Sequence, residues 1–175
     1  AKADGTDGNW DFFPQFAPLE PVISSADLAL CHLETPLAKL DVGYEGYPTF
    51  NAPPQITDAI TKLGFDMCGT ASNHSLDQGF SGLVRTIEIL EAAGIPHTGT
   101  AVSQAAASKP LIMDVETANG VVKVGILSYT YGFNGFERDS DKAWSANLID
   151  AEAIIAEAKL ARSQGAEIVI TKLHW

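Results

Sequence analysis

Basic residues are scarce in this sequence. Its 175 residues include 11 Lys and Arg against 22 Asp and Glu, which gives a formal net charge of −11 at pH 7. Binding to a nucleic-acid backbone requires clustered Lys and Arg, so we expect no nucleic-acid partner. A small molecule that carries phosphate is not excluded, because a bound metal ion can supply the missing positive charge.

Long apolar runs and cysteine motifs are also lacking. No run of 18 apolar residues could span a membrane, and the opening AKADGTDGNW lacks the apolar segment of a signal peptide. The two cysteines form no C-x-x-C pair, which argues against zinc-knuckle and thioredoxin-like motifs. The composition, 46% hydrophobic and 19% charged, is that of an ordinary globular protein, so we expect residues 1–175 to form a single domain.

The hydrophobic pattern of the first half predicts strands that alternate with helices. The Gly- and Asp-rich start is expected to be irregular through residue 11, and Pro18 and Pro21 should interrupt the helix after it. Longer helices are expected where apolar residues recur at helical spacing and a glycine follows, at 53–64 and 79–94. Short apolar segments predict strands at 27–34, 65–69 and 95–100.

The second half predicts a hairpin and then one more helix and strand. Asn119-Gly120 is a turn signal between strands at 110–117 and 121–130. Ser103 and Asp150 are expected to cap a short and a long helix, and a final apolar strand covers 166–175. Together the two halves predict an α/β fold, layered, with a mixed β-sheet.

Polar side chains gather where three of the predicted strands end. They are His32 and Glu34 after the first, Asn73, His74 and Asp77 after the second, and His174 at the last. Parallel strands place their carboxyl ends at one edge of a sheet, where ligands bind. Carboxylate, amide oxygen and imidazole suit Mn, Fe or Zn, and a metal-assisted hydrolase also uses a histidine to protonate a leaving group.

Each of these residues also has a structural interpretation. Asn73 and Asp77 can bond to the backbone of a turn, and His74 can be a structural histidine. Glu34 can pair with a lysine, and His32 can be an ordinary buried or capping histidine. The spacing matches no specific metal motif and does not decide between these interpretations. The convergence of three strand ends is what favours a functional site.

Three further residues have a weaker case for a functional role. Cys31 and Cys68 lie just before the polar strand ends, on strands that we expect to be adjacent. Buried free thiols are the favoured interpretation, and a cross-strand disulfide requires that the two residues fit bridging geometry. His97 lies in a short turn-like segment, where we expect a surface position.

Five stretches resemble the bacterial capsule-synthesis protein CapA family, the poly-gamma-glutamate capsule biosynthesis group. They are ADLALCHLETPLA, YPTFNAPPQITDAITKLGFDMCGTASNHSLDQG, GLVRTIEILEAAGIPHTGT, VKVGILSYTYGFNG and IVITKLHW. The resemblance covers about residues 11–175, and NHSLDQG and YPTFNAPP are its most specific parts. Because the family domain is similar to the calcineurin-like metallophosphoesterase superfamily, the resemblance implies a layered metallophosphoesterase-like sandwich.

The family motifs match this sequence with two replacements. The family's Asn-Leu-Glu corresponds to His32-Leu33-Glu34, so histidine replaces asparagine. Its Asn-Asn-His-x-x-Asp-x-Gly corresponds to residues 72–79, with Ser72 at the first asparagine. Its His-Trp-Gly begins at His174-Trp175.

The resemblance implies a role for each matching residue. Glu34, Asn73 and His174 would be metal ligands. His74 would contact the phosphate and protonate the leaving oxygen, and Asp77 would orient His74. The cofactors implied are divalent metal ions, two of them in the superfamily, which would activate a water molecule and hold the phosphate oxygens.

Two family segments have no counterpart in these residues. They are an opening strand with a Gly-Asp ligand and a downstream Gly-x-His-x-His segment. We therefore expect the sandwich to be incomplete at both ends and the metal site to be partial.

The implied function is capsule (poly-gamma-glutamate) biosynthesis with a metal-dependent phosphoesterase site. The expected location is the cell surface, on the extracytoplasmic side of the membrane. The expected partners are capsule polymer-synthesis membrane proteins, with a phosphoester or polymer as substrate. Catalysis is left open, since the replacements at 32 and 72 motivate an alternative, a non-catalytic component of a cell-surface polymer synthesis or export complex. A third hypothesis is a carbohydrate- or peptide-binding module that uses Tyr44, Tyr47 and Phe50.

Overall fold

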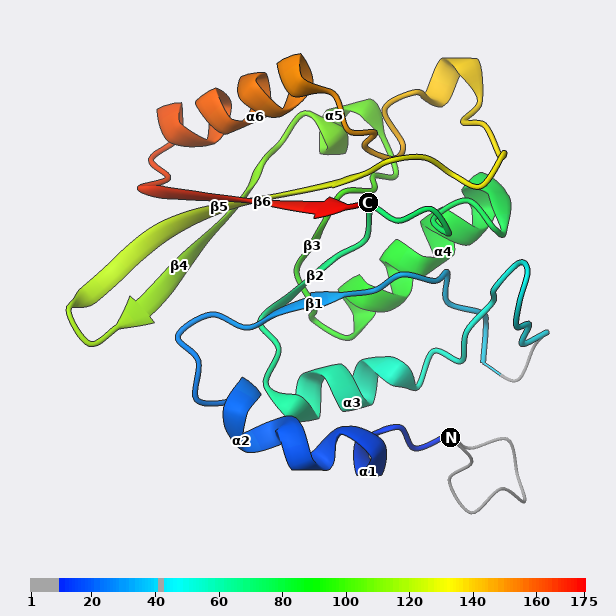
Figure 1. Cartoon of the computed structure of the whole chain (residues 1–175), viewed down its shortest axis with the longest axis horizontal. Helices are drawn as coiled ribbons and strands as arrows, with labels where there is room; N and C mark the ends of the chain where they lie inside the picture. The colour runs from blue at the N-terminus through cyan, green and yellow to red at the C-terminus, as the bar shows by residue number, and fades with distance from the viewer. Residues whose placement is uncertain (1–9, 41–42) are drawn as a thin grey trace.

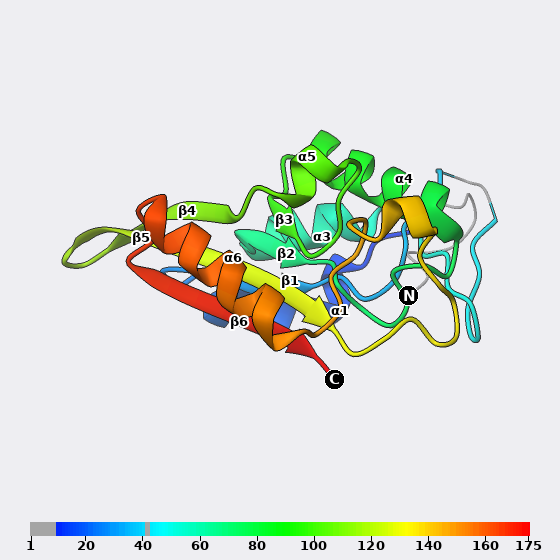
Figure 2. The same ribbon diagram turned by 90° about the horizontal axis from the view of Figure 1, so that it is seen from above.

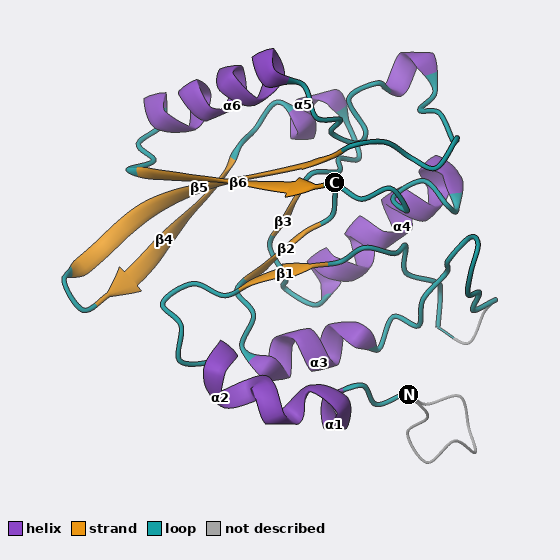
Figure 3. Ribbon diagram, in the orientation of Figure 1, coloured by secondary structure: helices purple, strands orange, loops and turns teal. Residues whose placement is uncertain are grey.

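Six strands form two three-stranded sheets in the computed structural model, which describes residues 10–40 and 43–175 (Figures 1 and 3). The irregular segment expected at the start therefore lies mostly outside the described residues. Helices lie on the outer sides of the two sheets (Figure 1), and the view from above shows a long one lying across the mixed sheet (Figure 2). No helix in the described ranges is long and apolar enough to cross a bilayer.

The first sheet is entirely parallel and short-stranded. Its strands are β1 (Leu30–His32), β2 (Met67–Gly69) and β3 (His97–Thr98), in that order. The crossovers are helices α3 (Ile56–Leu63) and α4 (Gly79–Ala92), as parallel neighbours require. Gly64 ends α3 at a φ of 87°, where a side chain would be strained, so the predicted glycine stop is confirmed.

The second sheet is the predicted mixed sheet. Strands β4 (Leu111–Thr117) and β5 (Gly120–Thr130) form the antiparallel hairpin, and β6 (Ile168–His174) pairs in parallel with β5. Helix α6 (Ala151–Ser163) makes the crossover, and the Asp150 carboxylate accepts from the Ala153 N–H at 2.8 Å. The layered α/β fold is therefore confirmed, with the mixed sheet facing a second, parallel one.

The remaining helical segments are short. Ser103 caps α5 (Gln104–Ala107), as predicted, and the connection from β5 to α6 contains a 3₁₀ turn at Ser140–Lys142. The prolines of the first predicted helix break it into α1 (Phe13–Phe16), a 3₁₀ turn (Ala17–Leu19) and α2 (Glu20–Ile23). Each piece carries a proline in its first two positions, where the missing N–H costs nothing.

Apolar side chains hold the two sheets together. Met67 of β2 is fully buried against Val115, Val124 and Ile126 of the second sheet, with Ile170 of β6 beside them. On the other side of the first sheet, α3 and α4 pack on a separate cluster that contains Leu37, Ile60, Cys68 and Leu90. Burial of each such side chain contributes about 1.5–3 kcal/mol to the stability of the fold. This packing fixes how the two sheets lie against each other and therefore where the ends of their strands meet.

The expectation of free thiols is wrong. Cys31 of β1 and Cys68 of β2 are direct partners in the parallel register, with Cα atoms 4.5 Å apart, and they form a disulfide. This separation lies within the range that a disulfide spans. The register decided the outcome, because a shift of one residue would place the two side chains on opposite faces.

Candidate functional site

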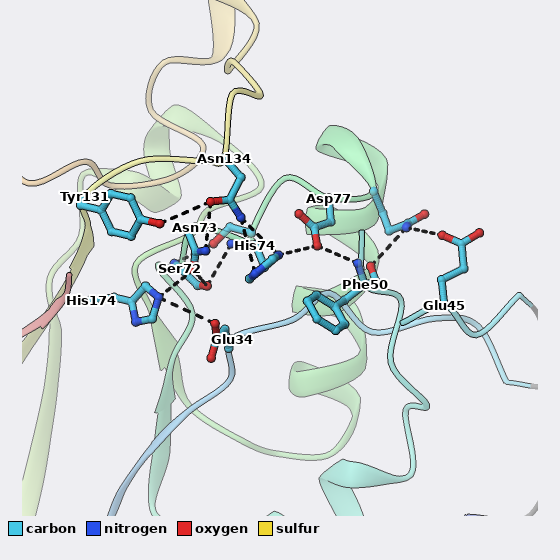
Figure 4. Close-up of polar contacts among 12 residues, drawn as sticks. Glu34, Glu45, Phe50, Ser72, Asn73, His74, Asp77, Tyr131, Asn134 and His174 are labelled. Atoms are coloured by element: carbon cyan, nitrogen blue, oxygen red, sulfur yellow. Dashed lines mark hydrogen bonds and ion pairs between the residues drawn. The ribbon is translucent and has the colours of Figure 1, made fainter. Parts of the chain in front are cut away.

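The carboxyl ends of β1, β2 and β6 meet at one place, and the three predicted metal ligands lie there together. Asn73 Oδ1 is 2.7 Å from His174 Nε2, and Glu34 Oε1 is 3.9 Å from the same nitrogen (Figure 4). Asn73 and His174 are 101 residues apart in sequence. The packing of the mixed sheet against the parallel one brings them into contact, so the strand-end argument predicted a real juxtaposition.

The loop after β2 is held by its own hydroxyl groups. Ser75 Oγ accepts from the Ser72 N–H and donates to the Thr70 carbonyl, each at 2.8 Å. Ser72 Oγ accepts from the His74 N–H at 3.0 Å and donates to Asn73 Oδ1 at 3.2 Å. Ser72 is fully buried. The serine that replaces the family asparagine therefore orients both Asn73 and His74.

His74 and Asp77 form a close pair within this loop. His74 Nδ1 lies 2.7 Å from Asp77 Oδ2, and since a carboxylate only accepts, the histidine nitrogen is the donor. The Asp77 side chain is 0% exposed and also accepts the Phe50 N–H at 2.7 Å. Two donors thus fix this carboxylate, and it fixes the tautomer of His74 so that the proton is on Nδ1.

An aromatic ring and an amide complete the surroundings of His74. The Phe50 ring meets His74 edge to face, with centroids 4.7 Å apart. Asn134 Nδ2 lies 3.5 Å from both ring nitrogens of His74, while Asn134 Oδ1 accepts from Asn73 Nδ2 at 3.1 Å. Asn134 therefore connects the His74–Asp77 pair to the Asn73–His174 contact (Figure 4).

Asn134 and its neighbour Tyr131 were missing from the predicted site. They follow β5, and the Tyr131 hydroxyl donates to Asn134 Oδ1 at 3.3 Å. Asn134 has a φ of 53°, which is rare for a residue with a side chain and marks a constrained position. The strand-end rule could have found both residues, because the stretch YGFNG directly follows the second strand of the predicted hairpin.

His32 lies beside this group, in contact with two further side chains. Its ring stacks on that of His174 with centroids 4.5 Å apart, and its Nδ1 contacts Lys172 Nζ. Burial lowers the pKa of His32 to about 4, helped by the nearby Lys172 and His174, while the Gly69 backbone acts weakly in the opposite direction. Burial also lowers the pKa of Lys172, and Glu34 opposes that shift.

The donor set fits a divalent metal ion. One nitrogen or carboxylate oxygen from each of His32, Glu34 and His174 lies within 4.8 Å of the others, although His32 Nδ1 also contacts Lys172 Nζ. Asn73 Oδ1 adds an amide oxygen beside His174. This mixture of oxygen and imidazole nitrogen suits Mn, Fe or Zn. At 2.7 Å, Asn73 Oδ1 and His174 Nε2 share either a proton or a cation, because two lone pairs would otherwise repel.

Other residues singled out in the sequence lie differently. His97 is half-buried on β3, outside the group of strand-end residues, and it lines a small cavity with Glu91 and Lys109. Tyr47 is 87% exposed, whereas the Phe50 ring packs edge to face on His74.

These features define an α/β sandwich protein with a polar site at the carboxyl ends of its strands. All 175 residues match the family described as bacterial capsule synthesis protein PGA_cap, and the chain belongs to this family. It is 31% identical over 140 residues to the uncharacterized proteins y4sH and y4uA of Sinorhizobium fredii, an alignment that covers 76% of this chain and 29% of theirs.

It is also 26% identical over 176 residues to a probable polyglutamine synthesis accessory protein of Mycobacterium tuberculosis, across 97% of this chain and 46% of that protein. The chain thus spans less than half the length of these curated relatives.

Proposed function

We propose that this chain supplies one wall of a metal-dependent phosphoesterase site in a protein of capsule-polymer synthesis. The observation that carries the proposal is the His74–Asp77 pair, connected through Asn134 to the Glu34, Asn73 and His174 donors. The family and the name of the mycobacterial relative support the biosynthetic role.

Glu34, Asn73 and His174 would hold a divalent ion such as Mn, Fe or Zn. When bound, such an ion polarises a phosphoryl oxygen and makes a water molecule more acidic. The Glu34 side chain is 48% exposed and that of His174 is 22% exposed, so solvent and substrate can reach Glu34. Ser72 and Asn134 hold Asn73 from two sides and orient its amide oxygen.

His74 would serve as the proton donor to the leaving oxygen. Asp77 keeps a proton on Nδ1, so the second ring nitrogen, Nε2, is the one that can exchange a proton with a substrate. The Phe50 ring covers one side of the imidazole, and the buried carboxylate prevents the ring from rotating. The chain's own residues therefore position a single proton-transfer atom.

The disulfide supports an extracytoplasmic location for the proposal, because disulfides persist in oxidising compartments and are rare in the cytosol. Capsule polymer-synthesis membrane proteins would be the partners, and the substrate would be a phosphoester or the polymer itself. The net charge of −11 argues against nucleic acid in this role.

The test is hydrolysis of p-nitrophenyl phosphate and its diester by the full-length protein, with and without Mn²⁺. His74→Ala should lower kcat by about 10²–10⁴-fold, the usual contribution of a general acid. His97→Ala is the matched control, because this histidine lies on β3 outside the site and should leave kcat unchanged. Absence of Mn²⁺-dependent turnover by the unaltered protein would refute the proposal.

A non-catalytic component of a polymer synthesis or export complex is the second candidate. The word "accessory" in the name of the mycobacterial relative and the histidine at position 32 favour it. It predicts that cells with His74→Ala still make polymer. Loss of polymer while the protein level is unchanged would count against it.

A further inference from the structure

The side chain of Lys172 reaches across the two sheets. Every second side chain of β6 lies on the face toward the parallel sheet, namely Ile170, Lys172 and His174. Ile170 packs on the cluster around Met67. A Cβ atom at Gly69 would lie 2.8 Å from Lys172 Cδ, so the glycine leaves the room that the lysine stem occupies. Since Gly69 is the β2 partner of His32, the stem leads the ammonium to the His32 ring.

This contact determines what the His32 ring can do. A lysine ammonium only donates hydrogen bonds, so His32 Nδ1 accepts and its lone pair is used. A neutral imidazole carries one proton, which must then be on Nε2. Nε2 is buried and makes no hydrogen bond of ordinary geometry within residues 10–40 and 43–175. Neither nitrogen therefore has a lone pair left for a metal ion.

We infer that Lys172 holds His32 as an N–H donor beside the candidate metal ligands, so that His32 is a positioning residue and not a ligand. The inference rests on the proposed metal site of Glu34, Asn73 and His174 and narrows it. His32 then acts through the face of its ring, which stacks on His174 and restricts the orientation of that imidazole. Lys172 contributes a fixed positive charge to the same edge.

The test is the tautomer of His32 in the metal-free full-length protein, read from long-range ¹H–¹⁵N correlation spectra and assigned with a His32→Asn variant. We expect a protonated Nε2 and an unprotonated Nδ1. Lys172→Met should shift the Nδ1 resonance, and Lys123→Met should not, because Lys123 pairs with Asp114 on the exposed hairpin. A protonated Nδ1 in the unaltered protein would overturn the inference, with no variant required to fold.

Mn²⁺ affinity separates this inference from the proposed function. Glu34→Gln should weaken Mn²⁺ binding by about tenfold or more. Even the loss of a side chain that only hydrogen-bonds to a metal ligand has an effect of this size. His32→Asn should weaken it far less, and an equal loss would contradict the inference. If Glu34→Gln and His174→Ala both leave Mn²⁺ binding unchanged, the proposed metal site fails, while the tautomer still decides the role of Lys172.

Discussion

The two parts of the candidate site are built in different ways. The His74–Asp77 part lies within eight consecutive residues, 72–79, and its hydroxyl, carboxylate and backbone groups bond mainly to one another. The Glu34–His174 part combines the ends of strands from two sheets, and Lys172 contacts His32 from 140 residues away. The first part needs a correctly formed loop, whereas the second needs the sheets to pack in register. Variants that change one polar group of the loop should therefore affect only the first part. Variants that disturb the packing of the strands should affect the second.

Asp77→Asn is the sharpest disruption of the local part. The amide preserves the shape, but its NH₂ group can donate to His74 Nδ1, and its neutral oxygen holds the Nδ1 proton less strongly than the carboxylate does. We expect kcat for phosphoester hydrolysis to fall by about 10²-fold or more, since the tautomer of His74 is no longer fixed. Mn²⁺ affinity should change little. A loss of Mn²⁺ binding equal to the loss of kcat would show that the two parts are not separable.

Removal of the disulfide tests the packing that joins β1 to β2. The Cys31→Ala/Cys68→Ala variant should lose about 2–4 kcal/mol of unfolding free energy, the usual value for a disulfide. The bridge closes a separation of 37 residues. Urea unfolding of the variant measures the loss, and reduction of the unaltered protein provides an independent comparison. Equal unfolding midpoints with and without reductant would contradict the disulfide.

Gly69→Ala tests the space between the sheets. Its new methyl group would meet Lys172 Cδ at 2.8 Å and Ser128 Oγ at 3.0 Å, so we expect a loss of about 1–3 kcal/mol from overpacking. The His32 Nδ1 resonance should shift as the lysine moves. Gly46→Ala is the matched control, because nothing lies within 4 Å of the added atom. An unchanged unfolding free energy for Gly69→Ala would show that the stem is not confined there.

Protonation of His32 should make stability depend on pH in metal-free protein. The pKa of His32 is lowered from 6.5 to about 4, chiefly by burial, so the unfolded chain binds the extra proton first. The unfolding free energy should therefore fall as the pH decreases from 6.5 to about 4, and His32→Asn should reduce that slope. Denaturant unfolding at several pH values in the presence of a chelator measures it. Identical slopes in both proteins would refute the assignment.

Tyr131→Phe should have the smallest effect. The change removes one hydrogen bond to Asn134 from a side chain that is 55% exposed. We therefore expect the free energy of unfolding to fall by no more than about 0.5–1.5 kcal/mol. If Asn134 connects the two parts, kcat and Mn²⁺ affinity should decrease together by a small factor. If neither quantity changes, the Tyr131 hydroxyl does not help to hold Asn134 in place.

Local patterns in the sequence predicted most of the elements. The helix stops at Gly64 and after α4, the caps at Ser103 and Asp150, and the Asn119-Gly120 turn are interactions between residues a few positions apart. The loop of residues 72–79 belongs to the same class, because its spacing places His74 and Asp77 three residues apart. The site residues at separate strand ends could be grouped only through the rule that parallel strands end at one edge.

Local patterns in the sequence could not predict which residues of neighbouring strands stand opposite each other. The free-thiol expectation failed because the pairing of Cys31 with Cys68 depends on which residues of β1 and β2 stand opposite each other. Asn134 was missed for a similar reason, since its position follows from how the loop after β5 packs.

The sequence by itself determined the alternation of strands and helices, the capping of the helices and the placement of His74 and Asp77 three residues apart in one loop. These depend on hydrophobic periodicity and on bonds between near neighbours, which any chain with these residues would form. Tertiary structure alone decided that His174 meets Asn73 and Glu34, that Cys31 meets Cys68, and that Lys172 reaches His32 past Gly69. Burial of apolar surface between the two sheets sets their relative position, and no local bond in the sequence carries that information.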